Sequence, residues 1–158
     1  SLVAGMYLLA GLNLVVKVLF FLPVIWAPRA RAGGQLPKDV KVSVIIPAYN
    51  EADSIGDVCR LLLKSTSASA EYVEFIVVDD RSSDKTWAVL DELRRDTGDP
   101  RFKPMSGHER GKVHWKGKNW AVWQGYEAAC REPPKGQHYL LFLDADVSLS
   151  PGAIESFV

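Results

Sequence analysis

Two aspartates separated by one small residue, Asp144 and Asp146, stand directly after the apolar run 139–143. Two carboxylates so close together repel each other unless a cation lies between them. A hard divalent ion such as Mg²⁺ or Mn²⁺ takes oxygen ligands and keeps open positions for the oxygens of a substrate phosphate. The pair therefore indicates a metal site for a phosphorylated ligand. Considered alone, an Asp-x-Asp sequence is more often a polar strand exit in which one aspartate caps a turn.

Polar residues also follow two other apolar runs. Asp79 and Asp80 come directly after the run 75–78, and one of their carboxylates could accept a hydrogen bond from a base N–H or a ribose hydroxyl. Pro47 ends another run, and Tyr49 beside it could stack on a planar base. Each feature also has an ordinary explanation, because aspartates are common in loops after strands and a loop tyrosine often only packs. Whether these residues form one site depends on whether the ends of the three runs lie next to each other in the fold.

The elements that carry these residues alternate between strand and helix. Aliphatic and β-branched runs predict strands, and apolar residues at three- and four-residue spacing predict helices with one buried face. The predicted strands cover 42–46, 72–78 and 139–143, and the predicted helices begin at 53 or 54, at 83 or 84, at 119 and at 151. This alternation predicts an α/β fold, a Rossmann-like, mostly parallel sheet with flanking helices. Ligands bind such sheets at the carboxyl ends of the strands, so we expect the polar residues to converge.

The composition excludes several classes of protein. With 19 basic and 19 acidic residues, the 158-residue chain has no net charge, which indicates no nucleic acid partner. Cys59 and Cys130 lie far apart without a CxxC spacing, so we expect core residues in a reducing compartment rather than a disulfide scaffold or a zinc site. His108, His114 and His138 match no metal-ligand spacing.

The first part of the chain is almost continuously apolar. Residues 2–28 have the length of a transmembrane helix, with Asn13 and Lys17 as polar interruptions. A cleaved signal peptide is the alternative, but a basic start is missing and the apolar run is too long. Basic residues follow at once, so the positive-inside rule places the rest in the cytoplasm. The expected organisation is a single-pass membrane anchor at 1–28, a basic linker at 29–41 and a folded domain at 42–158.

A second basic stretch precedes the helix predicted at 119. Six basic residues and one acidic residue lie from Arg101 to Lys118, together with three glycines. Such a loop could close over an anionic ligand or meet a membrane surface, and the alternative is a solvated surface loop. The nearby Trp115, Trp120 and Trp123 could contact an apolar ligand or only pack.

Three motifs follow one another along the chain with predicted helices between them: VSVIIPAYNE at 42–51, VVDDRSSDKT at 77–86 and LLFLDAD at 140–146. This combination resembles the nucleotide-binding half of the inverting glycosyltransferases of family 2, which have the GT-A fold. The resemblance covers residues 42 to about 147. The segment HWKGKNWA at 114–121 further resembles an element of the hopanoid-associated glycosyltransferases and, more distantly, of the ceramide glucosyltransferases. Those relatives are membrane-anchored enzymes with lipid acceptors.

The resemblance implies a role for each matching position. The nucleoside pocket would comprise Pro47, Tyr49, Glu51, Asp79 and Asp80. Within it, Asp80 would bind the base and Asp79 would support the loop. Asp144 would lie near the ribose and the metal, and Asp146 would be the main protein ligand of a Mg²⁺ or Mn²⁺ ion that bridges the diphosphate. Lys118 would contact the diphosphate or the sugar, because its point charge offsets phosphate charge.

The implied enzyme transfers a sugar from a nucleoside diphosphate donor, with UDP-sugars favoured, to a hydroxyl of a lipid or glycan acceptor with inversion. The metal would stabilise the departing diphosphate, and a carboxylate base would deprotonate the acceptor. In the family that base belongs to a later motif, and Glu155 follows the Asp-x-Asp pair too closely to serve. We therefore expect the base beyond Val158, and we expect this N-terminal, donor-binding part to bind nucleotide weakly and transfer little sugar.

Other classes of protein remain open. A membrane-tethered nucleotide-sugar-binding module without turnover is the main alternative, since the catalytic base is expected elsewhere. A nucleotidyltransferase of similar fold would show a glycine-rich, basic loop after the first strand, which PAYNEADS at 47–54 is not. A receiver-like domain would need a single phospho-accepting aspartate on a central strand and a lysine after a later strand.

Overall fold

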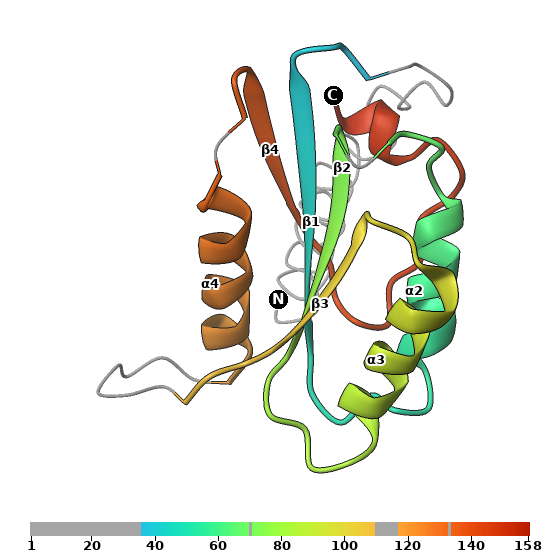
Figure 1. Ribbon diagram of the computed structural model, residues 1–158, viewed down its shortest axis with the longest axis vertical. Helices are drawn as coiled ribbons and strands as arrows, with labels where there is room; N and C mark the ends of the chain where they lie inside the picture. Colours follow the sequence, from blue (N-terminus) through green and yellow to red (C-terminus); the bar gives the residue numbers. More distant parts are fainter. Residues whose placement is uncertain (1–35, 70, 110–116, 133) are drawn as a thin grey trace, which may run out of the picture. The chain divides into compact units, whose positions relative to one another are not determined.

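A four-stranded parallel sheet forms the centre of the protein in the computed structural model, which describes residues 36–158 except 70, 110–116 and 133. The strands are β1 (Val40–Ala48), β2 (Val73–Asp79), β3 (Phe102–Ser106) and β4 (Gln137–Phe142), in the spatial order β3-β2-β1-β4. All neighbouring strands pair in parallel, so their carboxyl ends lie at one edge of the sheet (Figure 1). The predicted α/β fold with a parallel sheet is confirmed.

The two middle strands are buried on both faces. All of β2 is buried, and in β1 only Lys41 is partly exposed. Successive side chains of a strand point to opposite faces. Val42 and Val44 accordingly belong to the core on one face of the sheet, and Ile45 belongs to the core on the other face. Strands of this kind have nearly continuous apolar sequences, which is why β1 and β2 could be predicted.

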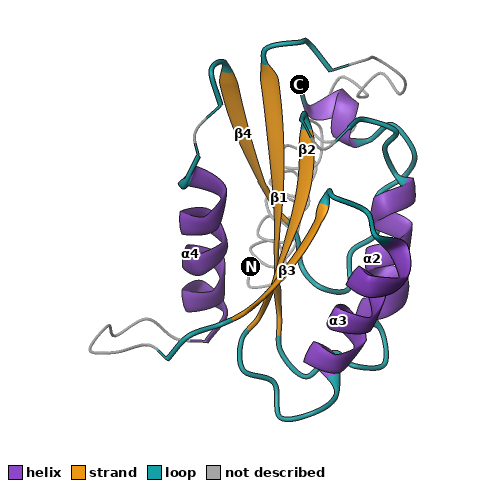
Figure 2. Cartoon of the chain, in the orientation of Figure 1, coloured by secondary structure: helices purple, strands orange, loops and turns teal. Residues whose placement is uncertain are grey.

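Helices α2 (Ile55–Lys64) and α3 (Thr86–Thr97) cover one face of the sheet (Figure 2). Their apolar sides supply Ile55, Cys59, Leu62, Leu90 and Leu93 to the core. Asp84 precedes α3, and its Oδ1 accepts the backbone N–H of Thr86, the first residue of the helix, at 2.9 Å. Gly98, with φ at +55°, ends the same helix in the left-handed conformation that glycine adopts readily.

Helix α4 (Gly117–Cys130) covers the opposite face and lies close to it. The residues that it turns toward the sheet are small, among them Ala121, Gly125 and Ala129. A Cβ atom added at Gly125 would lie 2.4 Å from Cγ2 of Ile45, so the helix touches β1 at this point. The helix predicted from 119 is therefore confirmed, with its start two residues earlier.

Two elements differ from the sequence prediction. The basic stretch after α3 contains β3, which pairs with β2 at the edge of the sheet. Pro104 weakened the strand signal there, although a proline without an N–H is tolerated in an edge strand. The last element is a short 3₁₀-helix, Ile154–Phe157, where the sequence predicted a helix beginning at 151.

None of the helices within the described part of residues 36–158 combines the length and hydropathy of a membrane span. The predicted anchor at 1–28 and the linker up to residue 35 lie outside the described residues. The first strand begins at Val40, two residues before the predicted start of the strand.

Candidate functional site

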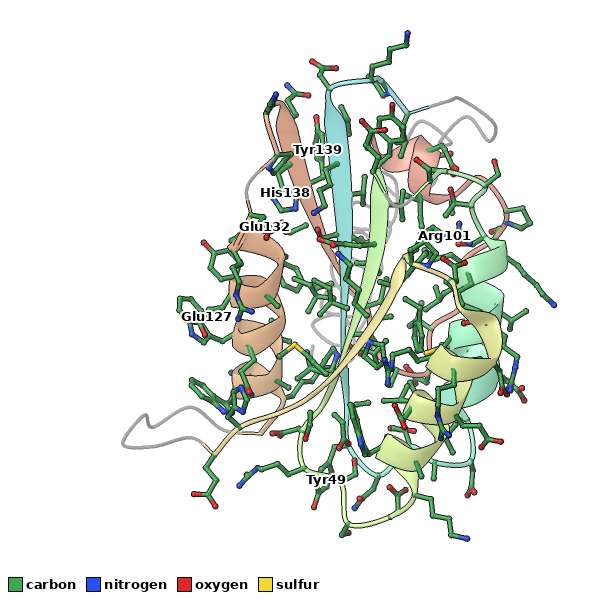
Figure 3. The ribbon with its side chains drawn as sticks, in the orientation of Figure 1. Tyr49, Arg101, Glu127, Glu132, His138 and Tyr139 are labelled. Carbon is green, nitrogen blue, oxygen red and sulfur yellow. The ribbon has the colours of Figure 1, made fainter. Side chains whose placement is uncertain are left out.

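A cavity of about 820 Å³ opens at the carboxyl edge of the sheet, where the loops after β1, β2 and β4 meet the start of α4. It is lined by Pro47, Ala48, Tyr49, Glu51, Asp80, Arg81, Gly117, Lys118, Asp144, Ala145 and Asp146. Of the residues assigned to the nucleotide-sugar and metal site, the structure thus brings together all except Asp79. Figure 3 shows Tyr49 beyond the carboxyl ends of the strands, and its side chain is 59 % exposed.

Asp79 lies behind the cavity and shapes the loop that follows β2. Its buried carboxylate accepts hydrogen bonds from the hydroxyl of Ser82 at 2.5 Å and from the backbone N–H of Ser82 at 3.3 Å. Its carbonyl oxygen accepts the backbone N–H groups of Arg81 and Gly107, each at 2.8 Å. With Arg81 in the left-handed region at φ +58°, this arrangement places Asp80 and Arg81 at the cavity wall. Asp79 therefore does not line the cavity but fixes the positions of Asp80 and Arg81, which do.

A second set of hydrogen bonds joins the loop after β1 to the loop after β2. Asn50 has φ at +55°, and its backbone N–H donates to Oγ of Ser82 at 2.9 Å. Its side-chain oxygen accepts the backbone N–H of Ser83 at 2.8 Å. One residue later, the backbone N–H of Glu51 donates to Oγ1 of Thr86 at 2.8 Å. These hydrogen bonds fix the loop that carries Tyr49 relative to the loop that carries Asp80.

The loop after β3 is held against α4 by two side chains that bond to the backbone of one residue, His108. The backbone N–H of His108 donates to Oε1 of Gln124 at 2.6 Å, and its carbonyl oxygen accepts the indole N–H of Trp120 at 2.9 Å. Gln124 is buried, and its Nε2 donates to the carbonyl oxygen of Trp120 at 3.3 Å. Because Gly107 bonds to Asp79, this loop is fixed against the rear of the site.

The Asp-x-Asp pair lies at the mouth of the cavity with both carboxylates exposed. Oδ1 of Asp144 lies 2.5 Å from Nζ of Lys118, so a cationic group already contacts this carboxylate. Two oxygen donors beside an open cavity suit a hard divalent ion, and the residues fit the predicted metal. Among the described residues, no cluster of three or more His, Cys, Asp or Glu side chains could hold a metal ion.

The basic stretch before α4 does not act as one unit. Arg101 pairs with Asp99 at 2.7 Å and donates to the carbonyl oxygen of Leu63 at 2.9 Å, which ties it to the end of α2. Lys103 pairs with Glu74 at 2.5 Å on the sheet. These two residues therefore have structural roles, contrary to a loop that closes over a ligand. Lys118 lines the cavity, and Arg110, Lys112, Trp115 and Lys116 lie outside the described residues.

Several other candidates lie away from the cavity. Glu155 accepts a hydrogen bond from Oγ1 of Thr66, in keeping with its exclusion as a base. Both cysteines are free; Cys59 is buried, and burial raises the pKa of its thiol to about 12, whereas Cys130 is only partly buried. Trp123 is half-exposed beside Tyr126, with 5.2 Å between the ring centroids.

Sequence reasoning missed Arg81, Asn50 and Gln124. Arg81 sits inside the motif VVDDRSSDKT and was passed over because the acidic pair beside it carried the chemical signal. Asn50 is a residue type that tolerates positive φ, and that signal could have marked it as a turn residue. Gln124 carried no signal, since a polar residue between Trp123 and Gly125 in a helix is usually assigned to the exposed side.

The family comparison matches this site and its scaffold together. The description of the family whose model fits residues 43–158 is glycosyl transferase family 2. The chain belongs to this family. The matched residues include the ends of β1, β2 and β4, and the predicted family is confirmed. The narrower resemblance to hopanoid-associated and ceramide glucosyltransferases is not decided by this match.

Curated relatives of this family 2 chain include two named transferases. One is the 4,4'-diaponeurosporenoate glycosyltransferase of Staphylococcus haemolyticus, 34% identical over 109 residues, which are 69% of this chain and 25% of that protein. Another is the undecaprenyl-phosphate 4-deoxy-4-formamido-L-arabinose transferase of Proteus mirabilis, 42% identical over 52 residues, 33% of this chain and 16% of that protein. The chain thus spans at most about a quarter of either relative's length.

Solved structures support the fold of this family 2 domain. The mannosyltransferase PcManGT of Pyrobaculum calidifontis, in complex with GDP-Man and Mn²⁺, has a TM-score of 0.55 at 20% identity, covering 89% of this chain and 38% of that one. TarS 1–349 of S. aureus, in complex with UDP-GlcNAc, has a TM-score of 0.51 at 23% identity, covering 73% and 29%. At these identities the likeness establishes a GT-A-like fold.

Proposed function

We propose that this family 2 domain binds the nucleoside diphosphate sugar of a metal-dependent, inverting glycosyltransferase, with a UDP-sugar as donor. One observation carries the proposal: a single cavity gathers an exposed tyrosine, three aspartates and a lysine at the carboxyl edge of a parallel sheet. Parallel sheets bind nucleotides at this edge. The structural neighbours in complex with UDP-GlcNAc and GDP-Man support the class of ligand.

The nucleoside would occupy the part of the cavity formed by the loops after β1 and β2. Tyr49 offers an exposed ring on which a base can stack, and Pro47 and Glu51 border it. Asp80 would accept a hydrogen bond from the base. Asp79 supports that carboxylate indirectly, through the loop that it fastens to Ser82.

The diphosphate would lie between α4 and the loop after β4. Asp146, with Asp144 beside it, would hold a Mg²⁺ or Mn²⁺ ion, and Lys118 would reach the phosphate oxygens. When bound, the ion stabilises negative charge on the departing diphosphate. Lys118 adds a second positive charge at the same place from the first turn of α4.

The acceptor is proposed to be a lipid or a lipid-linked group. Support comes from the element WKGKNWA at 115–121 and from the apolar segment 2–28. It also comes from the names of two relatives, which include undecaprenyl phosphate and 4,4'-diaponeurosporenoate. The corresponding localisation is a single-pass membrane protein with its catalytic domain in the cytoplasm.

Inverting transfer needs a base that takes the proton of the acceptor hydroxyl. We assign that base to a part of the enzyme beyond Val158, because the carboxylates that line the cavity are already assigned to donor and metal. A nucleotide-sugar-binding module without turnover is the second candidate, and it rests on the same cavity. The two differ in whether a longer protein that includes this base transfers sugar from the donor bound in the cavity.

Calorimetric titration of the full chain in detergent tests the donor site. UDP, GDP and CDP are added with and without Mn²⁺ to the wild type, Asp80→Ala and Asp146→Ala, and Asp96→Ala on the exposed side of α3 is the control. We expect Mn²⁺-dependent binding of UDP that weakens about tenfold or more in both site variants and stays unchanged in the control. Equal, weak heats for all nucleotides with a folded protein would contradict the proposal.

A further inference from the structure

Lys118 and Asp144 form an ion pair inside the cavity itself. Nζ of Lys118 lies 2.5 Å from Oδ1 of Asp144, and the side chains are 58% and 59% exposed. Lys118 is in the first turn of α4, and Asp144 follows β4. The pair therefore joins two separate elements at the point where the cavity also presents Asp146.

We propose that Lys118 is an internal counter-ion which a divalent cation must displace from Asp144, and which then transfers to the diphosphate of the donor. The inference rests on the proposed function and adds how the binding of the cation depends on the binding of the donor. The cation alone binds weakly because Lys118 competes for the same carboxylate. The cation binds tightly once a nucleoside diphosphate gives Lys118 another anionic partner.

The charges around the cavity give the reason. An ammonium group and a divalent cation on one carboxylate would repel each other at contact distance. Without donor, displacing Lys118 leaves its charge beside the cation with no new anion to neutralise it. A diphosphate supplies oxygens to both positive groups at once. Metal and nucleotide should therefore strengthen each other's binding by the same factor.

The ion pair is also weak enough to exchange partners. Pairs between exposed side chains contribute little, because water screens the charges and both side chains lose freedom. Lysine carries a compact charge on a flexible stem, so its ammonium group can turn toward a phosphate without movement of α4. A buried pair would instead keep the cation out.

Electron paramagnetic resonance of free Mn²⁺ measures the competition directly, without catalysis. The full chain in detergent is titrated with Mn²⁺ alone as wild type and as Lys118→Met, which keeps the stem and removes the charge. We expect Lys118→Met to bind Mn²⁺ about three- to tenfold more tightly. Lys135→Met, at an exposed position before the amino end of β4, is the control and should match the wild type.

Two further arms decide the assignment. In an Asp144→Asn background, Lys118→Met should bring no gain in Mn²⁺ affinity, because the contested carboxylate is gone. When UDP or GDP is added, the Mn²⁺ affinity of the wild type should rise by a larger factor than that of Lys118→Met. Unchanged or weaker Mn²⁺ binding by Lys118→Met would overturn the proposal that Lys118 competes with the cation for Asp144. A gain in Mn²⁺ affinity that persists in the Asp144→Asn background would overturn it as well.

Failure of the proposed function can be distinguished from failure of this inference, because nucleotide binding and Mn²⁺ binding are measured separately. If the wild type binds none of the nucleotides, the donor assignment fails, and with it the transfer of Lys118 to the diphosphate. The titration with Mn²⁺ alone still decides whether Lys118 competes for Asp144.

Discussion

The carbonyl oxygen of Asp79 accepts the backbone N–H of Gly107 at 2.8 Å, so the loop after β3 rests on the end of β2 directly behind the cavity. There is no room between them for a side chain, since a Cβ atom at Gly107 would lie 2.9 Å from this oxygen. His108, the next residue, is fastened to α4 by Gln124 and Trp120. Helix α4 thus supports the cavity wall that carries Asp80, through the loop after β3.

Gln124→Leu should destabilise the protein by about 1–3 kcal/mol, because the backbone N–H of His108 loses its acceptor in a partly buried place. Chemical denaturation measures the change, and hydrogen exchange of the His108 amide should accelerate. Glu127→Leu, at an exposed position in the same helix, is the control and should change stability by less than about 0.5 kcal/mol. Similar losses from the two substitutions would contradict this role of Gln124.

Substitution of Asn50 should lower the stability of the protein for two reasons, its positive φ and the hydrogen bond of its side-chain amide. Asn50→Ala replaces a residue type that tolerates φ +55° by one that tolerates it less well, and it removes the acceptor for Ser83, so we expect a loss of about 1–2 kcal/mol in denaturation. Asn50→Gly relieves the backbone cost only, and Asn50→Asp keeps the acceptor oxygen. The expected order of stability is wild type and Asp, then Gly, then Ala; an alanine variant as stable as the aspartate variant would count against the link between the loops.

The sequence predicted the parts of the fold in which the physical signal is local. β1 and β2 are buried on both faces and therefore appear as apolar runs, and the polar residues after them mark the carboxyl edge. The convergence of Tyr49, Asp80 and Asp144 followed from parallel pairing alone. Because parallel strands share one direction, the site could be placed without knowledge of the strand order.

The rest depended on contacts that no short segment reveals. β3 contains Pro104 and exposes part of its length, so its sequence lacks the pattern of a strand. The residue types alone do not distinguish Asp79 from Asp80, and the family resemblance assigned Asp79 to the support of the loop; the hydrogen bond to Ser82 that gives this support is seen only in the structure. In α4 the usual pattern is inverted, since small residues face the sheet and Trp123 is half-exposed.

Gly125→Ala tests how closely α4 approaches the sheet. The added methyl group would meet Cγ2 of Ile45 at 2.4 Å, so we expect a destabilisation of about 1–3 kcal/mol in thermal or chemical unfolding. The same substitution in an Ile45→Ala background should cost less, because the opposing methyl group is absent. Equal costs in the two backgrounds would mean that the helix shifts freely to accept the methyl group.

Ser43 joins the buried Glu74 and the partly buried His138 in a polar network on the sheet. The hydroxyl of Ser43 donates to Oε1 of Glu74 at 2.6 Å and lies 2.8 Å from Nε2 of His138, so a neutral His138 donates its Nε2–H to Ser43. Lys41 and Lys103 pair with the same carboxylate at 3.0 and 2.5 Å. Figure 3 shows His138 far from Tyr49, near the amino ends of the strands.

Both titrating groups make the fold less stable in acid. Burial, with the nearby Lys41, holds the pKa of His138 below its usual 6.5 against the opposing effect of Glu74. Burial alone would raise the pKa of Glu74, but the hydrogen bonds from Lys103, Ser43 and Lys41 outweigh it and hold the pKa below 4.5. In each case the unfolded chain takes up a proton at a higher pH than the folded protein, so stability is lost as the pH falls.

The free energy of unfolding, measured by denaturation at a series of pH values, should therefore decrease in two steps. The first begins as the pH falls below about 6.5 and should disappear in His138→Gln. The second begins below about 4.5 and should become smaller in Glu74→Gln, but it should not vanish, because side-chain hydrogen bonds also hold the pKa values of Asp84, Asp91 and Asp99 below 3.8. Glu74→Gln should also be less stable than wild type at pH 7, because Lys41 and Lys103 lose their counter-ion. Glu71→Gln, at an exposed position just before β2, is the control and should keep both steps. A first step that persists unchanged in His138→Gln would show that another group titrates there.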